Sequence, residues 1–336
     1  MKKFIIFAVL FCFVFAAVFA TGGADRDQRP VTLKYAHVGI AGEIQTRYVD
    51  ELAVLVNQRT NGRVTIQVFP NSQLGGASEM TDGIRSGAIE MGHHEFSTLE
   101  RFLSEMGVFN APYIFRDTEH VLAATNPKTS PILQRLNNDL VRAGGVRVLG
   151  VIYRGSRQLS TNFPVRSPAD LAGKRIRGVP NAVYMSMLQG MGAVPTPVEI
   201  AELYTALLTG MVDGQENPIT NIHTQRFHEV QTHIMLTSHM VSIPCVFINE
   251  RVWQNLGAEN QRIIGECLEE MTKRSVQWVR DEEAPVRREM ETVHGITFID
   301  EAGGLRNDLF RAGVNTQISA DFPLWAPLIR EISNIR

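Results

Sequence analysis

The 336-residue sequence predicts an α/β protein with two domains. Segments of alternating hydrophobicity, which are typical of strands, take turns along the chain with segments of helical periodicity. The length suffices for two domains at roughly 100 to 200 residues each. A charged, helically periodic segment at 258–293 is long enough to lie across both domains.

The first series of elements indicates one α/β domain. Strands are expected at 31–38 and 64–69, and helices at 44–57, 80–86, 118–124 and 132–143, with a short apolar stretch at 89–92. The first helix is expected to stop at Thr60-Asn61-Gly62.

The second series repeats this alternation. Strands are expected at 146–153, 174–179 and 241–249, and helices at 182–191 and 200–209. Ser167 before Pro168 suits a helix start, because the hydroxyl can accept from a free amide while proline has none to leave unpaired. In the long segment 258–293, Pro285 is expected to kink the helix or end it.

The first 20 residues have the features of a secretory signal peptide. Lys2 and Lys3 precede an apolar run, and Val18 and Ala20 supply the small residues of a cleavage site. The run of about 16 residues is shorter than the roughly 20 needed to span a bilayer. We therefore expect cleavage near Ala20 and an exported chain that is not membrane-spanning.

Charge and cysteine content exclude other classes. The 33 basic and 35 acidic residues leave a net charge of -2, which disfavours a nucleic-acid-binding protein. Only Cys245 and Cys267 remain beyond the signal peptide, which is not a disulfide framework. Two buried free thiols are expected, with a Cys245–Cys267 disulfide as the alternative.

Motifs for catalysis and metal binding are absent from the sequence. It has no G-x-S-x-G, G-x-x-x-x-G-K, G-x-G-x-x-G or C-x-x-C. His228 and His233 are five residues apart, about 140° on a helix, whereas metalloproteases need a spacing of four. The carboxylates at 269–270 and 281–283 are expected to form surface ion pairs. We expect no catalytic residues, no metal ligands and no cofactors.

Three polar segments lie at the ends of predicted elements. Residues 155–158 (GSRQ) follow a strand, and 173–181 (GKRIRGVPN) place Arg175 and Arg177 on one face of a strand. Residues 212–218 (VDGQENP) are expected to form a turn-rich run after a helix.

These segments resemble the solute-binding proteins of tripartite ATP-independent periplasmic (TRAP) transporters, the DctP family. Further matches are NGR at 61–63, VFP at 68–70, QLG at 73–75, PYIF at 112–115 and PTP at 195–197. The resemblance implies the two-domain periplasmic binding protein fold, with a ligand cleft between the domains and the long helix spanning both. It also implies closure of the domains around an organic anion.

The implied function is that of a periplasmic receptor, not an enzyme, that delivers an organic acid to TRAP permease membrane subunits. After the signal peptide at 1–20, the first domain is expected to comprise 31–154 and 243–280, and the second 155–242 and 281–336. Two other classes stay open: a secreted lyase or hydrolase with Glu95 or a histidine as base, and a ligand-sensing subunit without transport.

The resemblance implies specific binding residues in the second domain. The arginine of the family's K-I-R-V-P strand corresponds to Arg177, the second arginine to Arg157, and the asparagine of E-N-P to Asn217. A guanidinium binds a carboxylate through two parallel hydrogen bonds, and leaving it unpaired in a closing cleft costs roughly several kcal/mol. Gly178 is one residue more than the family pattern, so the strand is expected to bulge, with Arg175 as an alternative clamp.

The remaining candidates are polar residues near the expected cleft. Glu95 lies where related sialic-acid receptors have a ligand-facing glutamate, and His94 beside it could donate to a hydroxyl. A carboxylate suits a hydroxylated ligand because it accepts hydrogen bonds from hydroxyls. His37, at the end of the first strand, and His239, at the return crossing, are expected near the cleft, with a structural role as the alternative for each. Asn181 ends the second polar segment.

A sugar acid, either a uronate or an aldonate, is the leading ligand class. Residues 202–231 are more similar to members that take hydroxylated acids than to those that take simple keto acids. Ile200 stands where the family often has an aromatic residue, which weakens the case for sialic acid. Sialic acid, C4-dicarboxylates and small keto or hydroxy acids are the alternatives.

Overall fold

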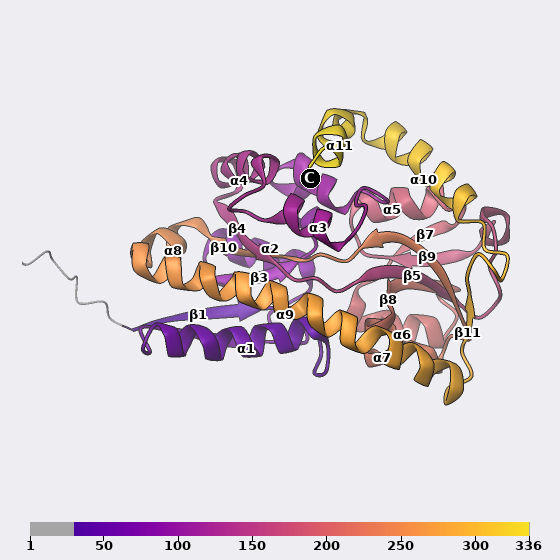
Figure 1. Cartoon of the computed structure of the whole chain (residues 1–336), viewed down its shortest axis with the longest axis horizontal. Coiled ribbons are helices and arrows are strands. Elements are labelled where there is room, and N and C mark those ends of the chain that lie inside the picture. Colours follow the sequence, from indigo (N-terminus) through magenta and orange to yellow (C-terminus); the bar gives the residue numbers. More distant parts are fainter. Residues whose placement is uncertain (1–29, 336) are drawn as a thin grey trace, which may run out of the picture.

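The structure is a computed structural model that describes residues 30–335, and these form two α/β domains, each built around one sheet (Figure 1). The first sheet has the order β2-β1-β3-β10-β4. Its strands are β1 (Val31–Ala36), β2 (Val64–Phe69), β3 (Met91–His94), β4 (Val146–Val151) and β10 (Cys245–Asn249). Strand β1 is parallel to β2 and β3, whereas β10 returns from far along the chain and runs antiparallel to β3 and β4.

The second sheet has the order β11-β9-β5-β8-β6-β7. Its strands are β5 (Ser156–Thr161), β6 (Arg175–Gly178), β7 (Val194–Pro197), β8 (Gly214–Pro218), β9 (His233–Val241) and β11 (Thr297–Ile299). The sequence predicted no strand at β8 and a turn-rich run in its place, which is wrong. All five β8 residues are buried, and ladder hydrogen bonds to β5 and β6 on both sides outweigh the turn preference of Gly214, Asn217 and Pro218.

Helices cover both sheets close to the predicted positions. The first domain contains α1 (Ile44–Arg59), α2 (Ala77–Ser86), α3 (Thr118–Thr125), α4 (Pro131–Gly144) and α8 (Glu250–Asn255), and the second contains α5 (Ala182–Gly190), α6 (Ile200–Leu208) and α7 (Ile219–Thr224). The helix start expected at Ser167 is a single 3-10 turn, Pro168–Leu171, with a reciprocal capping box between Ser167 and Asp170.

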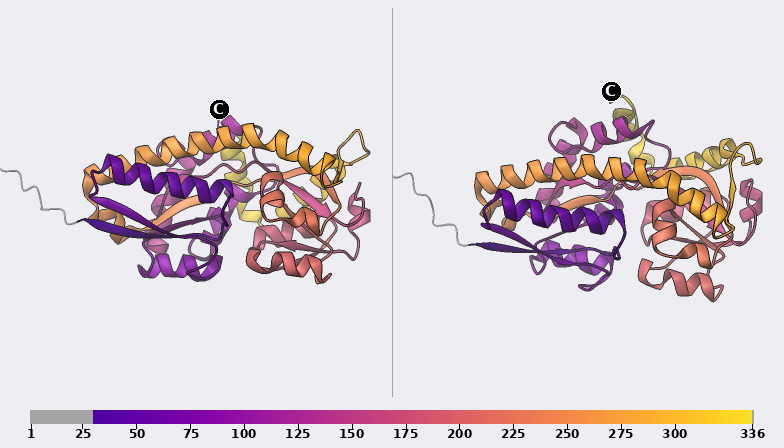
Figure 2. Two further views of the ribbon diagram at one scale, coloured as in Figure 1. Left: turned by 90° about the horizontal axis from the view of Figure 1, so that it is seen from below. Right: turned by 60° about the horizontal axis from the view of Figure 1, so that its bottom comes forward.

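Helix α9 (Gly257–Thr292) spans both domains, as predicted (Figure 2). It packs against α1 and β4 in the first domain and against α7 in the second. The helix continues through Pro285, which is exposed, so water can hydrate the carbonyl that lacks a partner there. Of the carboxylates expected to form surface ion pairs, Glu269, Glu270 and Glu282 do so, with Glu282 2.6 Å from Arg47. Asp281 and Glu283 form none within residues 30–335.

The domains are joined by α9 and by two crossings, from β4 to β5 and from β9 to β10. These crossings are hydrogen-bonded to each other, since the amide of Ile152 donates to Pro244 (2.9 Å) and that of Arg154 to Ser242 (3.0 Å). Helix α10 (Asn307–Asp321) packs against α5. Helix α11 (Ala326–Ser333) packs against α4 of the first domain.

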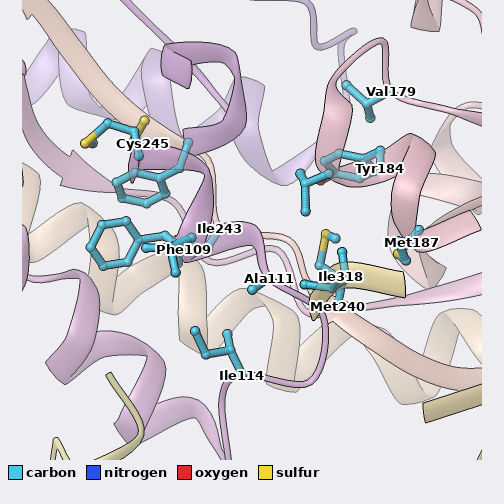
Figure 3. Packing of buried hydrophobic residues seen from close by; sticks show 14 of the residues in the cluster. Phe109, Ala111, Ile114, Val179, Tyr184, Met187, Met240, Ile243, Cys245 and Ile318 are labelled. Atoms are coloured by element: carbon cyan, nitrogen blue, oxygen red, sulfur yellow. The ribbon is translucent and has the colours of Figure 1, made fainter. Parts of the chain in front are cut away.

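Apolar packing continues through the crossing region. Phe109, Ile243 and Cys245 belong to the same buried apolar cluster as Tyr184 and Met240 of the second domain (Figure 3). Cys267 is also buried, and both cysteines are free thiols, as predicted. None of the helices in residues 30–335 is apolar over a stretch long enough to cross a bilayer. The predicted signal peptide lies outside the described residues.

Candidate ligand-binding site between the domains

A small cavity between the domains lies at the carboxyl ends of β1, β3, β6 and β8. Its lining residues are Val38, Gln45, His94, Glu95, Arg154, Arg157, Arg177, Val179, Glu199, Ile200, Asn217 and Asn221. Arg157 is the second residue of β5, but it pairs with Pro218 at the end of the antiparallel β8 and so reaches the same edge. The structure thus brings five of the eight predicted residues to one cavity: His94, Glu95, Arg157, Arg177 and Asn217. The other three, His37, Asn181 and His239, lie around it.

Arg177 is a buried cation with unused donors. Its side chain is 2% exposed, and its Nε donates to the carbonyl of Val198 (2.7 Å). Within residues 30–335, its two terminal nitrogens have no hydrogen bond or ion pair. Burial lowers the pKa of Arg177 to about 10, so the group is still charged at neutral pH. An anion in the cavity would satisfy these donors.

Arg175 does not line the cavity. It is half exposed at the start of β6, with its Nε 3.7 Å from the Asp213 carboxylate. The expected bulge at Gly178 is also wrong, because β6 pairs residue for residue with β7 and the register does not shift. A Cβ on Gly178 would lie 2.6 Å from Met185 Cε, so glycine at this position lets α5 pack closely on the strand.

Arg157 is neutralised by Glu216. Its Nη2 donates to Glu216 Oε1 and to the Glu216 carbonyl, both at 2.8 Å, and its Nε donates to Oε2. Burial would raise the pKa of Glu216, but Arg157 and a hydrogen bond from His239 outweigh it and lower the pKa to about 2. Nη2 also donates to Asn217 Oδ1 (3.1 Å). Arg157 therefore has little capacity left for a ligand beyond Nη1, which is 3.7 Å from Glu95.

The three predicted residues outside the lining have other partners. His239 is fully buried behind Glu216, with its Nε2 3.1 Å from Oε2 of that carboxylate. Asn181 donates to Ser97 Oγ (3.0 Å) and so links the second domain to the first. His37 is buried with its Nε2 unpartnered among the described residues. Burial lowers the pKa of His37 to about 4, so the ring is neutral.

Glu95 and His94 extend the polar wall from the first domain. The Glu95 carboxylate is 4% exposed and accepts from the hydroxyl of Ser242 (2.8 Å) and the amide of Asn110 (2.9 Å). His94 Nδ1 lies 2.6 Å from Thr98 Oγ1, and its Nε2 has no hydrogen bond within residues 30–335. Burial and the nearby arginines lower the pKa of His94 to about 3, so its ring is neutral and can exchange hydrogen bonds with hydroxyls.

Sequence reasoning missed a second polar group in the same cavity. Burial lowers the pKa of Arg154, whose one ion pair within residues 30–335 is a long contact, 3.9 Å, to Glu43 Oε2. Glu43 in turn accepts from Asn221 Nδ2 (2.8 Å), whose Oδ1 is buried without a partner among the described residues. Arg154 directly precedes the GSRQ segment, and Asn221 follows VDGQENP by three residues. Each residue thus lies next to a segment that the sequence analysis had singled out. No signal in the sequence pointed to Glu43.

Glu199 was missed as well, although it lies in a segment that matches the family. It precedes α6, and a Cβ on Gly76 of the first domain would lie 3.4 Å from its carboxyl carbon, so Glu199 faces that domain. Burial raises the pKa of Glu199, against the effect of Arg177. Its neighbour Ile200 contributes an apolar wall to the cavity.

A two-domain α/β architecture with a polar cavity between the domains, at the ends of the strands, is typical of solute-binding proteins. Residues 35–305 match the family described as bacterial extracellular solute-binding protein, family 7 (DctP), and the chain belongs to this family. The periplasmic binding protein fold, with its interdomain cleft and spanning helix, is thereby confirmed.

The family contains relatives with different ligands. The chain is 30% identical over 241 residues to the C4-dicarboxylate-binding periplasmic protein DctP of Shewanella loihica, covering 72% of this chain and 70% of that protein. It is also similar to a TRAP periplasmic solute-binding protein of Actinobacillus succinogenes with bound L-galactonate (TM-score 0.83, 26% identity, 90% and 99% of the two chains). A third match, from a Polaromonas species and bound to D-erythronate, has a TM-score of 0.83 and 27% identity over 91% and 99% of the chains.

Proposed function

We propose that this protein is a periplasmic receptor for a sugar acid with one carboxylate, of the aldonate or uronate type, and that it delivers this ligand to the membrane subunits of a TRAP permease. The observation that carries the proposal is the buried guanidinium of Arg177, whose terminal donors have no partner in the described chain. A carboxylate would bind them through two parallel hydrogen bonds. The family's description as extracellular and the predicted signal peptide support the location.

The distribution of charge favours an acid with one carboxylate. Arg157 is neutralised by Glu216 and Arg154 lies 3.9 Å from Glu43, so Arg177 is the one arginine of the cavity without an ion pair in residues 30–335. The rest of the wall offers carboxylates, amides and a neutral histidine, which can bind several hydroxyls. The two structural relatives with bound L-galactonate and D-erythronate support such a ligand.

A thermal-shift screen tests the proposal. The chain is expressed, unfolded and refolded to release any co-purified solute, and then screened against L-galactonate, D-erythronate, D-glucuronate, sialic acid and succinate. A ligand at about 1,000 times its Kd adds roughly 4 kcal/mol, which raises Tm by several degrees. A shift with aldonates or uronates, and recovery of the acid unchanged after incubation, supports a receptor that is not an enzyme. Turnover of the acid, or a shift with none of these acids, would overturn the proposal.

A C4-dicarboxylate receptor is the second candidate, because of Arg154. Its guanidinium has one ion pair, 3.9 Å long, and could bind a second carboxylate if Glu43 turned away. The same screen separates the two functions, since succinate would then give the largest shift. Co-purification with permease subunits, and not with a sensor kinase, would support transport over sensing.

A further inference from the structure

Three histidines meet in the second domain, outside the interdomain cavity. His223 belongs to α7, His228 to the 3-10 helix Phe227–Glu229, and His294 follows the end of α9. One ring nitrogen from each lies within 4.8 Å of the others. The rings of His223 and His228 are stacked at 5.1 Å, and the His228 and His294 rings are 4.4 Å apart.

The local backbone brings these rings together. Arg226 has a φ of 60°, and this left-handed residue turns the chain between α7 and the 3-10 helix so that His228 faces His223. The apolar neighbours Ile222, Phe227 and Met290 are fully buried in one cluster. The backbone on which the three histidines are mounted is thus held by the core of the second domain.

A carboxylate completes the group. Glu289, on the last turn of α9, has its Oε1 3.5 Å from His223 Nε2 and 3.8 Å from His294 Nε2. Its side chain is 50% exposed and that of His294 is 34% exposed, so both can adjust their rotamers. Three imidazoles and one carboxylate form a ligand set for zinc and related divalent transition metals.

His228 provides an independent sign that something is bound. It is 8% exposed, and its Nδ1 is buried without a hydrogen-bond partner among the described residues. Buried polar atoms are rarely left unpaired. An imidazole nitrogen without a proton offers its lone pair to a metal.

We propose that His223, His228, His294 and Glu289 bind one divalent transition-metal ion of the zinc class. In a tetrahedral zinc site the ligand atoms are roughly 3.3 Å apart, so small rotations of the exposed side chains would bring the present cluster to that spacing. No metal ligands were predicted from the sequence, because His228 was paired with His233. His233 begins β9 instead, and the third histidine of the cluster, His294, follows α9 much later in the chain.

The metal would tie α9 to α7. Helix α7 also carries Asn221, which lines the interdomain cavity two residues before His223. Metal binding would therefore stabilise the second domain without contacting the organic acid. The site is reached from a surface hollow that His228 and His294 line together with 295–296, so an ion can enter without unfolding of the chain.

The test is a metal titration of the full chain, produced without a histidine tag and stripped with a chelator. Zn²⁺ is titrated by calorimetry, and Co²⁺ is followed by its visible absorption, which is strong only in a tetrahedral site. We expect one ion per chain and a raised Tm. His294→Gln and Glu289→Gln should each weaken Zn²⁺ binding at least about 10-fold, while His233→Gln, a matched control outside the cluster, should bind as the wild type does.

Both exposed ligands can be changed without disturbing the core, and circular dichroism verifies that the variants fold. Wild-type chain that binds no Zn²⁺, or binds it no more tightly than His294→Gln, would overturn the proposal. An equal loss of binding in His233→Gln would overturn it too, because the ion would then bind elsewhere.

Discussion

Replacement of Arg177 by methionine separates ligand binding from folding. Methionine keeps much of the side-chain volume but removes the charge and all five donors. We expect the variant to lose affinity for the organic acid and to fold as stably as the wild type. This combination is unusual for a residue that is 2% exposed.

The magnitude follows from the burial of the charge. A fall of the pKa from 12.5 to about 10 means that the empty cavity disfavours the charged guanidinium by roughly 3 kcal/mol. A ligand carboxylate that pairs with Arg177 can recover that energy. Removing the guanidinium therefore corresponds to a Kd for the acid that is roughly 30- to 300-fold higher. The variant also loses the bond to the Val198 carbonyl, which offsets the relief of the buried charge. We expect a net change in the free energy of unfolding of less than about 1 kcal/mol.

Calorimetry with the acid selected by the screen measures the Kd, and urea unfolding of the ligand-free chain measures stability. Arg175→Met is the matched control, because this arginine lies on the same strand but is half exposed and paired with Asp213. It should leave the Kd within about twofold of the wild type. Affinity retained by Arg177→Met would refute the reasoning, as would an equal loss in both variants.

Three further changes test other parts of the structure. Arg157→Met leaves the buried Glu216 carboxylate without its cation and should lower the free energy of unfolding in urea by about 3–5 kcal/mol. A decrease below about 1 kcal/mol would contradict the proposed neutralisation. Asn181→Ala removes the hydrogen bond to Ser97 across the domains and should raise the Kd for the organic acid about 2- to 10-fold. Adding Ser97→Ala to this variant should raise the Kd no further, because the same hydrogen bond is already lost. Burial raises the pKa of Glu100 from 4.5 to about 8, so its contribution to stability is present below pH 4.5 and is lost as the pH rises through 8. Glu100→Gln should therefore be more stable than the wild type by about 1–3 kcal/mol at pH 8.5 and nearly equal at pH 4.5, whereas equal urea midpoints at both pH values would argue against a buried carboxylate.

Arg157 and Arg177 have different roles in the cavity, and this difference could not be predicted from the sequence. Both Arg157 and Arg177 were predicted as ligand residues, because the family resemblance covers both. The structure shows that Glu216, inside the VDGQENP segment, neutralises the first of them. Glu216 belongs to a segment that the sequence analysis singled out, but no local pattern indicated which arginine it would pair with between β5 and β8.

Periodicity determined most elements of this protein, because a core-facing pattern repeats every two residues in a strand and every 3.6 in a helix. It placed β1, α1, α4 and the 36-residue α9 close to their observed bounds. It failed for β8, whose Gly, Asn and Pro are poor strand formers and whose conformation depends on strands β5 and β6 on either side. Helix α9 also continues through Pro285, since water on that side can donate to the carbonyl that loses its helical partner.

The sequence by itself determined the fold class, the polar segments and the family that they resemble, since each of these depends on residues that are neighbours along the chain. The tertiary structure decided which side chains are paired. Within the described chain it left the terminal nitrogens of Arg177 without partners, paired Arg157 with Glu216, and brought His294 to His223 and His228. These outcomes depend on contacts between segments tens of residues apart. Such contacts are set by how the strands and helices pack, and no local pattern encodes them.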